Sequence, residues 1–115
     1  KIRISAGGEN FTATLDSTQA ANELVERLPM TLDMSELNGN EKFCYLDAPF
    51  ASEASRVGQI NAGDIMLFGD DCLVIFYESF ATGYSYTQLG RIDDASGLVE
   101  ALGSGPVTVT IEATN

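Results

Sequence analysis

Residues 63–92 read GDIMLFGDDCLVIFYESFATGYSYTQLGRI, and this stretch decides the fold. An apolar run over residues 64–68 is followed by turn-forming residues at 69–71 and by a second apolar run over residues 72–77. The second run is apolar at nearly every position, which predicts a strand buried on both faces. Residues 84–92 then alternate, with Tyr84 and Tyr86 on one face. These runs predict a central group of antiparallel strands.

Further strand patterns lie on both sides of this centre. Residues 1–5 and 11–15 alternate on either side of two glycines, as in a hairpin with one solvated face. Residues 30–35 alternate and lead through Asn38-Gly39, the strongest hairpin signal in the chain, to residues 43–45. Residues 107–112 form a final strand.

Eight or so short strands favour an antiparallel sheet that closes on itself, because closure removes exposed edges. The predicted fold is therefore mainly β: a small closed antiparallel β-barrel, forming one domain over residues 1–115. An open sandwich is the alternative, and periodicity does not separate the two.

One segment has convincing helical periodicity. Its apolar stripe predicts a helix of roughly three turns that begins near Asp16 or Ser17, with Asp16 and Gln19 as a capping box, and stops at Pro29. The apolar face is predicted to plug one mouth of the barrel. A short turn of helix is expected at residues 96–102.

Charge and hydropathy exclude several classes of partner. Six Lys and Arg against 17 Asp and Glu give a net charge of -11, which repels phosphate backbones, so nucleic acid is not an expected partner. No apolar run approaches the ~20 residues of a membrane-spanning helix, so no membrane insertion by this domain is expected. The chain starts at Lys1, already within a strand pattern, which predicts that any leader lies outside it; a cytoplasmic and an exported location both stay open.

Metal and cysteine chemistry are not expected. Cys44 and Cys72 are too few for a disulfide framework and sit inside strand patterns, which favours free, packed thiols, although a single bridge stays open. The acidic pairs at residues 70–71 and 93–94 lack the spaced oxygen ligands of a calcium loop, and two Cys without His cannot complete a zinc site. We expect no metal and no cofactor.

Residues 63–69, 72–77 and 89–92 resemble the small bacterial cyclophilin-like domains, which share "GDI", an apolar strand ending in two aromatics, and a later "GRI". Residues 37–43 and the pair Ser85-Tyr86 resemble the uncharacterised branch of that family, so the similarity spans nearly the whole chain. The resemblance implies an eight-stranded barrel like that of the peptidyl-prolyl isomerases, with reduced loops and helices. True isomerases shape the proline pocket with an arginine next to a phenylalanine and a histidine, a tryptophan and a second histidine. This chain has no His and no Trp.

The irregular segment over residues 47–62 is the expected home of a site, and Arg56 at its middle is the weak catalytic candidate. A guanidinium that donates to a twisted amide would lower the isomerisation barrier of ~18–20 kcal/mol without a proton relay. A ligand-binding site is predicted from Arg56 together with the aromatic side chains Phe43, Tyr45, Phe76, Tyr84 and Tyr86. The alternative roles are an ion pair for the arginine and strand packing for the aromatics.

Three functions are consistent with these features. The first is a binding module for an unknown peptide or small molecule, without established catalysis. The second is a minimal peptidyl-prolyl isomerase. The third is an accessory or assembly domain of a larger or anchored bacterial protein.

Overall fold

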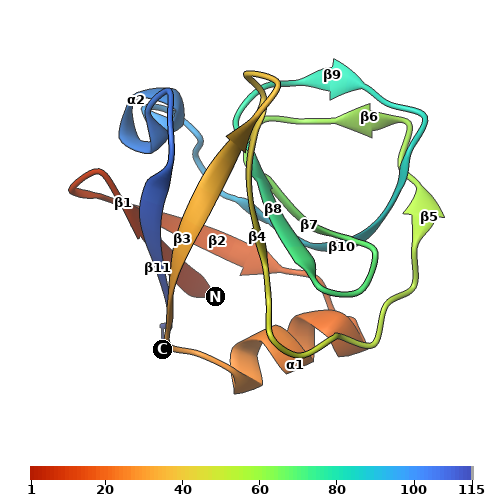
Figure 1. Cartoon of the computed structure of the whole chain (residues 1–115). Coiled ribbons are helices and arrows are strands. Elements are labelled where there is room, and N and C mark those ends of the chain that lie inside the picture. The colour runs from red at the N-terminus through yellow and green to blue at the C-terminus, as the bar shows by residue number, and fades with distance from the viewer. Residues whose placement is uncertain (115) are drawn as a thin grey trace.

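The computed structural model describes residues 1–114 and confirms the closed antiparallel barrel (Figure 1). The strands follow one another around the barrel in the order β2-β1-β11-β3-β4-β8-β7-β10, and pairing of β10 with β2 closes it. Closure excludes the open sandwich. The barrel strands are β1 (Ile2–Ala6), β2 (Glu9–Leu15), β3 (Met30–Leu37), β4 (Glu41–Tyr45), β7 (Asp64–Phe68), β8 (Cys72–Phe76), β10 (Ser85–Ile92) and β11 (Val107–Ala113).

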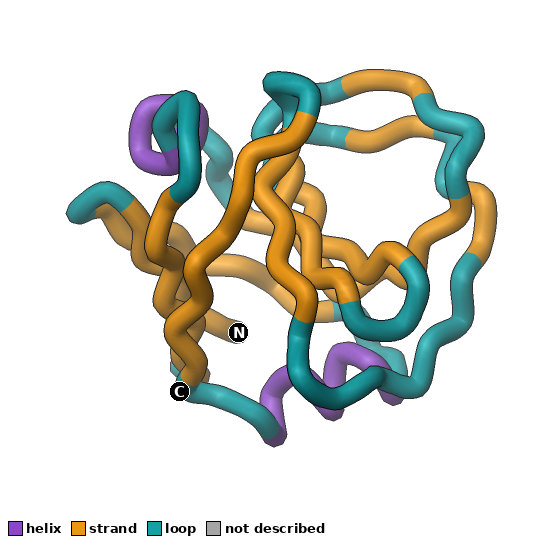
Figure 2. Tube along the Cα trace, in the orientation of Figure 1, coloured by secondary structure: helices purple, strands orange, loops and turns teal. Residues whose placement is uncertain are grey.

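Three short strands lie outside the barrel. β5 (Ser55–Arg56) pairs with the start of β10, while β6 (Gln59–Ile60) and β9 (Phe80–Ala81) form a two-stranded ribbon. Figure 2 shows this ribbon and its connecting loops beside the barrel, outside the ring of barrel strands. The segment predicted to be irregular therefore contains two of these strands.

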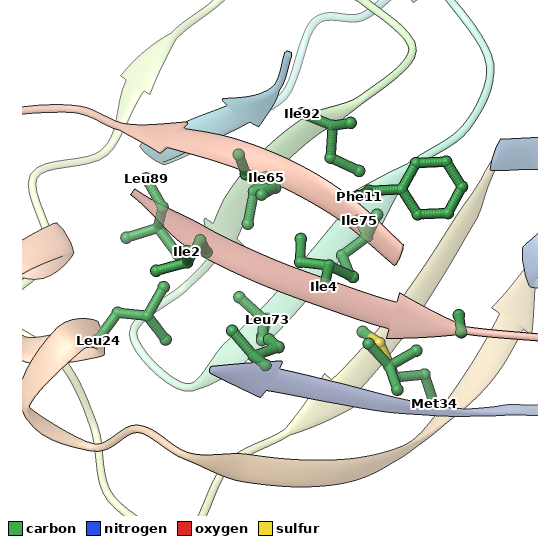
Figure 3. Packing of buried hydrophobic residues seen from close by; sticks show 14 of the residues in the cluster. Ile2, Ile4, Phe11, Leu24, Met34, Ile65, Leu73, Ile75, Leu89 and Ile92 are labelled. Carbon is green, nitrogen blue, oxygen red and sulfur yellow. The ribbon is translucent and has the colours of Figure 1, made fainter. Parts of the chain in front are cut away.

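The apolar residues form two clusters, one inside the barrel and one on its outer face. The inner cluster packs the inward side chains of the barrel strands around Ile4, Leu73 and Ile75 (Figure 3). The outer cluster joins Val74 and Phe76 of β8 to Ile60 of the ribbon. The prediction that the apolar strand at the centre is buried on both faces is thus confirmed.

Two helices lie at opposite ends of the barrel in Figure 1. α1 (Gln19–Glu26) buries Ala20, Ala21 and Leu24, as the apolar stripe predicts. Its predicted start and capping box are wrong: the cap is Thr18, whose hydroxyl accepts from the Ala21 N–H at 3.2 Å, so the helix begins later and is shorter. α2 (Leu98–Leu102) is the expected short turn, and Gly97 at φ 80 precedes it.

A bulge in β10 corrects the predicted alternation of that strand. The register against β7 shifts between Gln88 and Gly90, so Leu89 and Ile92 both enter the inner cluster instead of facing opposite sides. Gly90 also lies where β2 approaches closely: a Cβ there would clash with the Thr14 carbonyl oxygen. Closure of the barrel therefore requires a glycine at this position.

A buried lysine holds the α2 end of the barrel together. Lys42 is fully buried, and its Nζ donates to Glu36 Oε1 at 2.9 Å and to the carbonyl oxygens of Gly103 and Gly105 at 2.9 and 2.5 Å. The Tyr77 hydroxyl donates to the same Glu36 oxygen at 2.7 Å. Burial alone would raise the pKa of Glu36, but these hydrogen bonds outweigh it and lower the pKa. The network ties the β3–β4 hairpin to the loop after α2.

Among the described residues, no helix is long and apolar enough to cross a membrane.

Candidate functional site: an aromatic groove on the outer wall

A groove of about 290 Å³ runs over the outer face of β4, β8, β7 and β10. We call it the aromatic groove, because half of its lining residues are aromatic; the other half includes one carboxylate. It lies over part of the outer cluster, to which Cys72, Val74 and Tyr86 of its lining belong. Its lining residues are Leu37, Asn38, Glu41, Phe43, Tyr45, Phe68, Cys72, Val74, Tyr84 and Tyr86.

Strand register explains why these residues meet. Alternate residues of a strand share one face, so Glu41, Phe43 and Tyr45 point outward together from β4. Phe43 pairs with Val74 and Tyr45 with Cys72, and these two β8 residues form the buried floor. Lys42, between Glu41 and Phe43, points inward to its own network.

The rings form two groups on either side of β8. Phe43 and Tyr45 stand on β4 with ring centroids 6.1 Å apart in an edge-to-face arrangement. On the other side, Phe68 contacts Tyr84 at 6.0 Å and Tyr86 at 5.7 Å. Because β4 and β7 are two strand spacings apart, about 10 Å, there is room above β8 for one flat ring system.

Exposed apolar surface is concentrated at this groove. Six large hydrophobic side chains are exposed among the described residues, and the groove is lined by four of them, namely Leu37, Tyr45, Phe68 and Tyr84. The remaining two, Val25 and Val99, lie on the helices. Tyr45 and Tyr84 are 65% and 66% exposed, which is costly for a ring that has no further role.

Glu41 is the one charged residue of the lining. Glu41 is only 9% exposed, and no described residue donates a hydrogen bond to its carboxylate. Burial, followed by the negative charge of Glu36, raises the pKa of Glu41. The same carboxylate contributes, after burial, to the raised pKa of Tyr86. The groove therefore holds a largely buried carboxylate that has no hydrogen-bond donor among the described residues and keeps only limited contact with solvent.

Glu41→Gln is expected to stabilise the protein at neutral pH. A carboxyl whose pKa is raised in the folded state binds its proton more tightly there, so its stabilising contribution is present at low pH and is lost as pH rises through the raised pKa. Glutamine has no charge to desolvate. Urea unfolding at pH 7 should give a higher midpoint for the variant, and the gain should shrink towards pH 4. Equal midpoints at both pH values would contradict the assigned burial of the charge.

The structure brings four of the six predicted site residues together. Phe43, Tyr45, Tyr84 and Tyr86 all line the groove. Phe76 lies beside it in the outer cluster, where its ring contacts Tyr86 at 5.5 Å.

Arg56 is placed elsewhere. It is exposed on β5, opposite Ser85, with its guanidinium near Gly83, and it is not among the residues that line the groove. The segment over residues 47–62, expected to carry the site, contributes no lining residue either.

Sequence reasoning missed Glu41 and Phe68. The strand alternation could have indicated both residues. Glu41 precedes Phe43 by two residues on β4, and Phe68 ends β7, the strand next to the segment that carries the tyrosines. An acidic residue at the start of a strand is normally predicted to be exposed to solvent. The neighbouring sequence does not indicate that this face of β4 becomes covered.

The other candidate chemistries gain no support from the described residues. Cys44 and Cys72 are free; Cys44 packs against the inner cluster and Cys72 belongs to the outer one. Burial, then the negative charges of Asp71 and Glu41, raises the pKa of Cys72 to about 11, so its thiol is a poor nucleophile at neutral pH. Within residues 1–114 no group of three His, Cys, Asp or Glu is arranged to hold a metal ion.

The closed eight-stranded antiparallel barrel defines the fold class of the protein. The chain belongs to the Cyclophilin-like family, whose model matches residues 4–112. The resemblance inferred from the sequence is thereby confirmed.

One solved structure is similar over the full length of this chain: McbB, solved in complex with tryptophan, with a TM-score of 0.74 and 16% identity. The match covers 100% of this chain and 45% of the McbB chain, so this chain spans less than half of the length of McbB. At this identity the likeness concerns the fold alone. No curated protein matches by sequence.

Proposed function

We propose that this barrel is a binding module whose ligand site is the aromatic groove, and that its ligand is a small amphipathic molecule with one aromatic ring system. The observation that carries the proposal is the gathering of four of the six exposed large apolar side chains around one concavity. Exposed apolar patches of this kind mark binding sites. McbB, which shares the fold, was solved in complex with tryptophan, a ligand of this size and chemistry.

The size of the groove favours a small molecule over a long peptide. Its volume of about 290 Å³ is at the lower end of ligand pockets, which span roughly 300–1,000 Å³. Rings on both sides and a buried apolar floor suit a flat hydrophobic group. Glu41 and the hydroxyls of Tyr45 and Tyr84 supply polar contacts at the rim.

The isomerase alternative needs a guanidinium aimed at the bound amide. Arg56 is not in the groove lining, so no observation favours this alternative over ligand binding. The accessory-domain alternative stays a prediction.

Tyr45→Ala and Tyr84→Ala are each expected to weaken binding of an indole ligand by about 2- to 12-fold, the equivalent of the ~0.5–1.5 kcal/mol of one aromatic contact. The measurement is a titration of isotope-labelled protein with tryptophol, followed by amide and methyl NMR shifts. Saturable shifts should map to the groove.

Val25→Ala and Val99→Ala are the matched controls, since both side chains are 43% exposed and lie outside the groove. They should leave the affinity unchanged. Shifts confined to other surfaces, or equal weakening by the valine variants, would refute the proposed site.

A further inference from the structure

We propose that the aromatic groove selects a protonated amine, with the Glu41 carboxylate as the partner of the ammonium group and the rings holding the attached aromatic group. The ligand class is then an arylalkylamine that carries no carboxylate. This inference rests on the proposed function and adds the chemistry of its ligand.

The first support is that Glu41 lacks a partner where its neighbour has several. Glu36, on the inner face of the same hairpin, accepts from Lys42, Tyr77 and the Gly39 N–H. Glu41 lines the groove, is 9% exposed and accepts no hydrogen bond from any described residue. A buried charge without a partner is costly, and a donor supplied by the ligand removes that cost.

The second support is the sign of the surrounding charge. The groove lining contains no Lys or Arg, and Lys42, the nearest cation in sequence, is held on the other face by Glu36 and two carbonyl oxygens. Glu36 lies close enough to affect the titration of Glu41. The chain as a whole carries a net charge of -11. A cation is therefore attracted to the groove and an anion is repelled.

The third support is the spacing along β4. Phe43 follows Glu41 on the same face after two residues, a step of about 7 Å, and Tyr45 follows after the same step. An ammonium group joined to a ring by two carbons matches this step. The rings of Phe43 and Tyr86 line the groove with Glu41 and can add cation–π attraction.

Three indole ligands of nearly equal size test the inference: tryptamine, with a protonated amine; tryptophol, with a neutral hydroxyl; and indole-3-propionate, with a carboxylate. NMR titrations at pH 7 compare wild type with Glu41→Gln. Wild type should bind tryptamine at least about tenfold more tightly than tryptophol, as expected for a charge-assisted hydrogen bond, and indole-3-propionate most weakly. In Glu41→Gln the preference for tryptamine should fall to about twofold or less, while tryptophol affinity is maintained.

Glu78→Gln is the matched control, because it removes the same net charge from an exposed residue outside the groove lining. It should keep the tryptamine preference. Equal binding of tryptamine and tryptophol by wild type, or a preference that survives in Glu41→Gln, would overturn this inference while leaving the groove as a binding site. Failure of all three ligands to shift groove signals would overturn the proposed function itself.

Discussion

Replacing Lys42 by methionine is expected to lower the free energy of unfolding by about 3–5 kcal/mol, the range for breaking a buried ion pair from one side. The Lys42 ammonium satisfies Glu36 and the carbonyl oxygens of Gly103 and Gly105, at distances of 2.5–2.9 Å. Methionine fills a similar volume but donates nothing, so these acceptors lose a partner that buried water cannot easily replace. Urea denaturation measures the loss of stability. It is followed by circular dichroism, because the chain has no tryptophan to give a fluorescence signal.

Lys1→Met provides the control for this prediction. Lys1 also makes an ion pair, with Asp93 at 2.6 Å, but its side chain is 55% exposed, so the expected loss of stability is much smaller than for Lys42→Met. The double variant Glu36→Leu with Lys42→Met should recover part of the stability, because it removes the orphaned charge as well. A loss below about 1 kcal/mol for Lys42→Met would show that the network contributes little.

Phe76→Ala is the second substitution with a large expected cost, about 3–5 kcal/mol. Phe76 is fully buried at the end of β8, and its ring contacts Phe80 of the ribbon and Tyr86 of β10 with centroids 5.7 and 5.5 Å apart. Deleting the ring leaves a cavity between the barrel wall and the ribbon. Equilibrium unfolding in urea measures the cost.

Phe68→Ala serves as the comparison. Phe68 is also a phenylalanine, but it lies on the neighbouring strand β7 and is 45% exposed. Its stability loss should be less than half of that of Phe76→Ala, because exposed rings forfeit less transfer free energy. The two variants also separate roles: Phe68→Ala should weaken ligand binding more than it lowers stability. Equal stability losses would contradict the assignment of Phe76 to a second, outer core.

The fold was predictable because its signals are local. Short stretches of sequence contain the signals for strand alternation and for the Asn38-Gly39 turn. They also contain the signal for the strand over residues 72–77, which is apolar on both faces. The structure joins β3 and β4 through a three-residue loop over residues 38–40, in which Asn38 and Gly39 have φ values of 56 and 69. The bulge after Gln88 was missed, since it is set by how β10 fits between β7 and β2.

The site was predictable only in part, because a groove depends on what covers the neighbouring wall. Aromatic residues on alternating positions indicated a shared face, and Phe43, Tyr45, Tyr84 and Tyr86 do meet. Arg56 was chosen by its place in the family order, yet the side chain lies on a peripheral strand outside the groove. Glu41 was overlooked because its burial arises from residues far away in the sequence.

The central claim is that the aromatic groove binds the ligand, and intermolecular NOEs test it most directly. With tryptophol at saturation, ring protons of the ligand should show NOEs to the methyl groups of Leu37 and Val74, which line the rim and floor. NOEs instead to Phe11 and Thr12, which line a larger, acidic cleft of about 640 Å³ beside α2, or to Val25 and Val99 on the helices, would contradict the account.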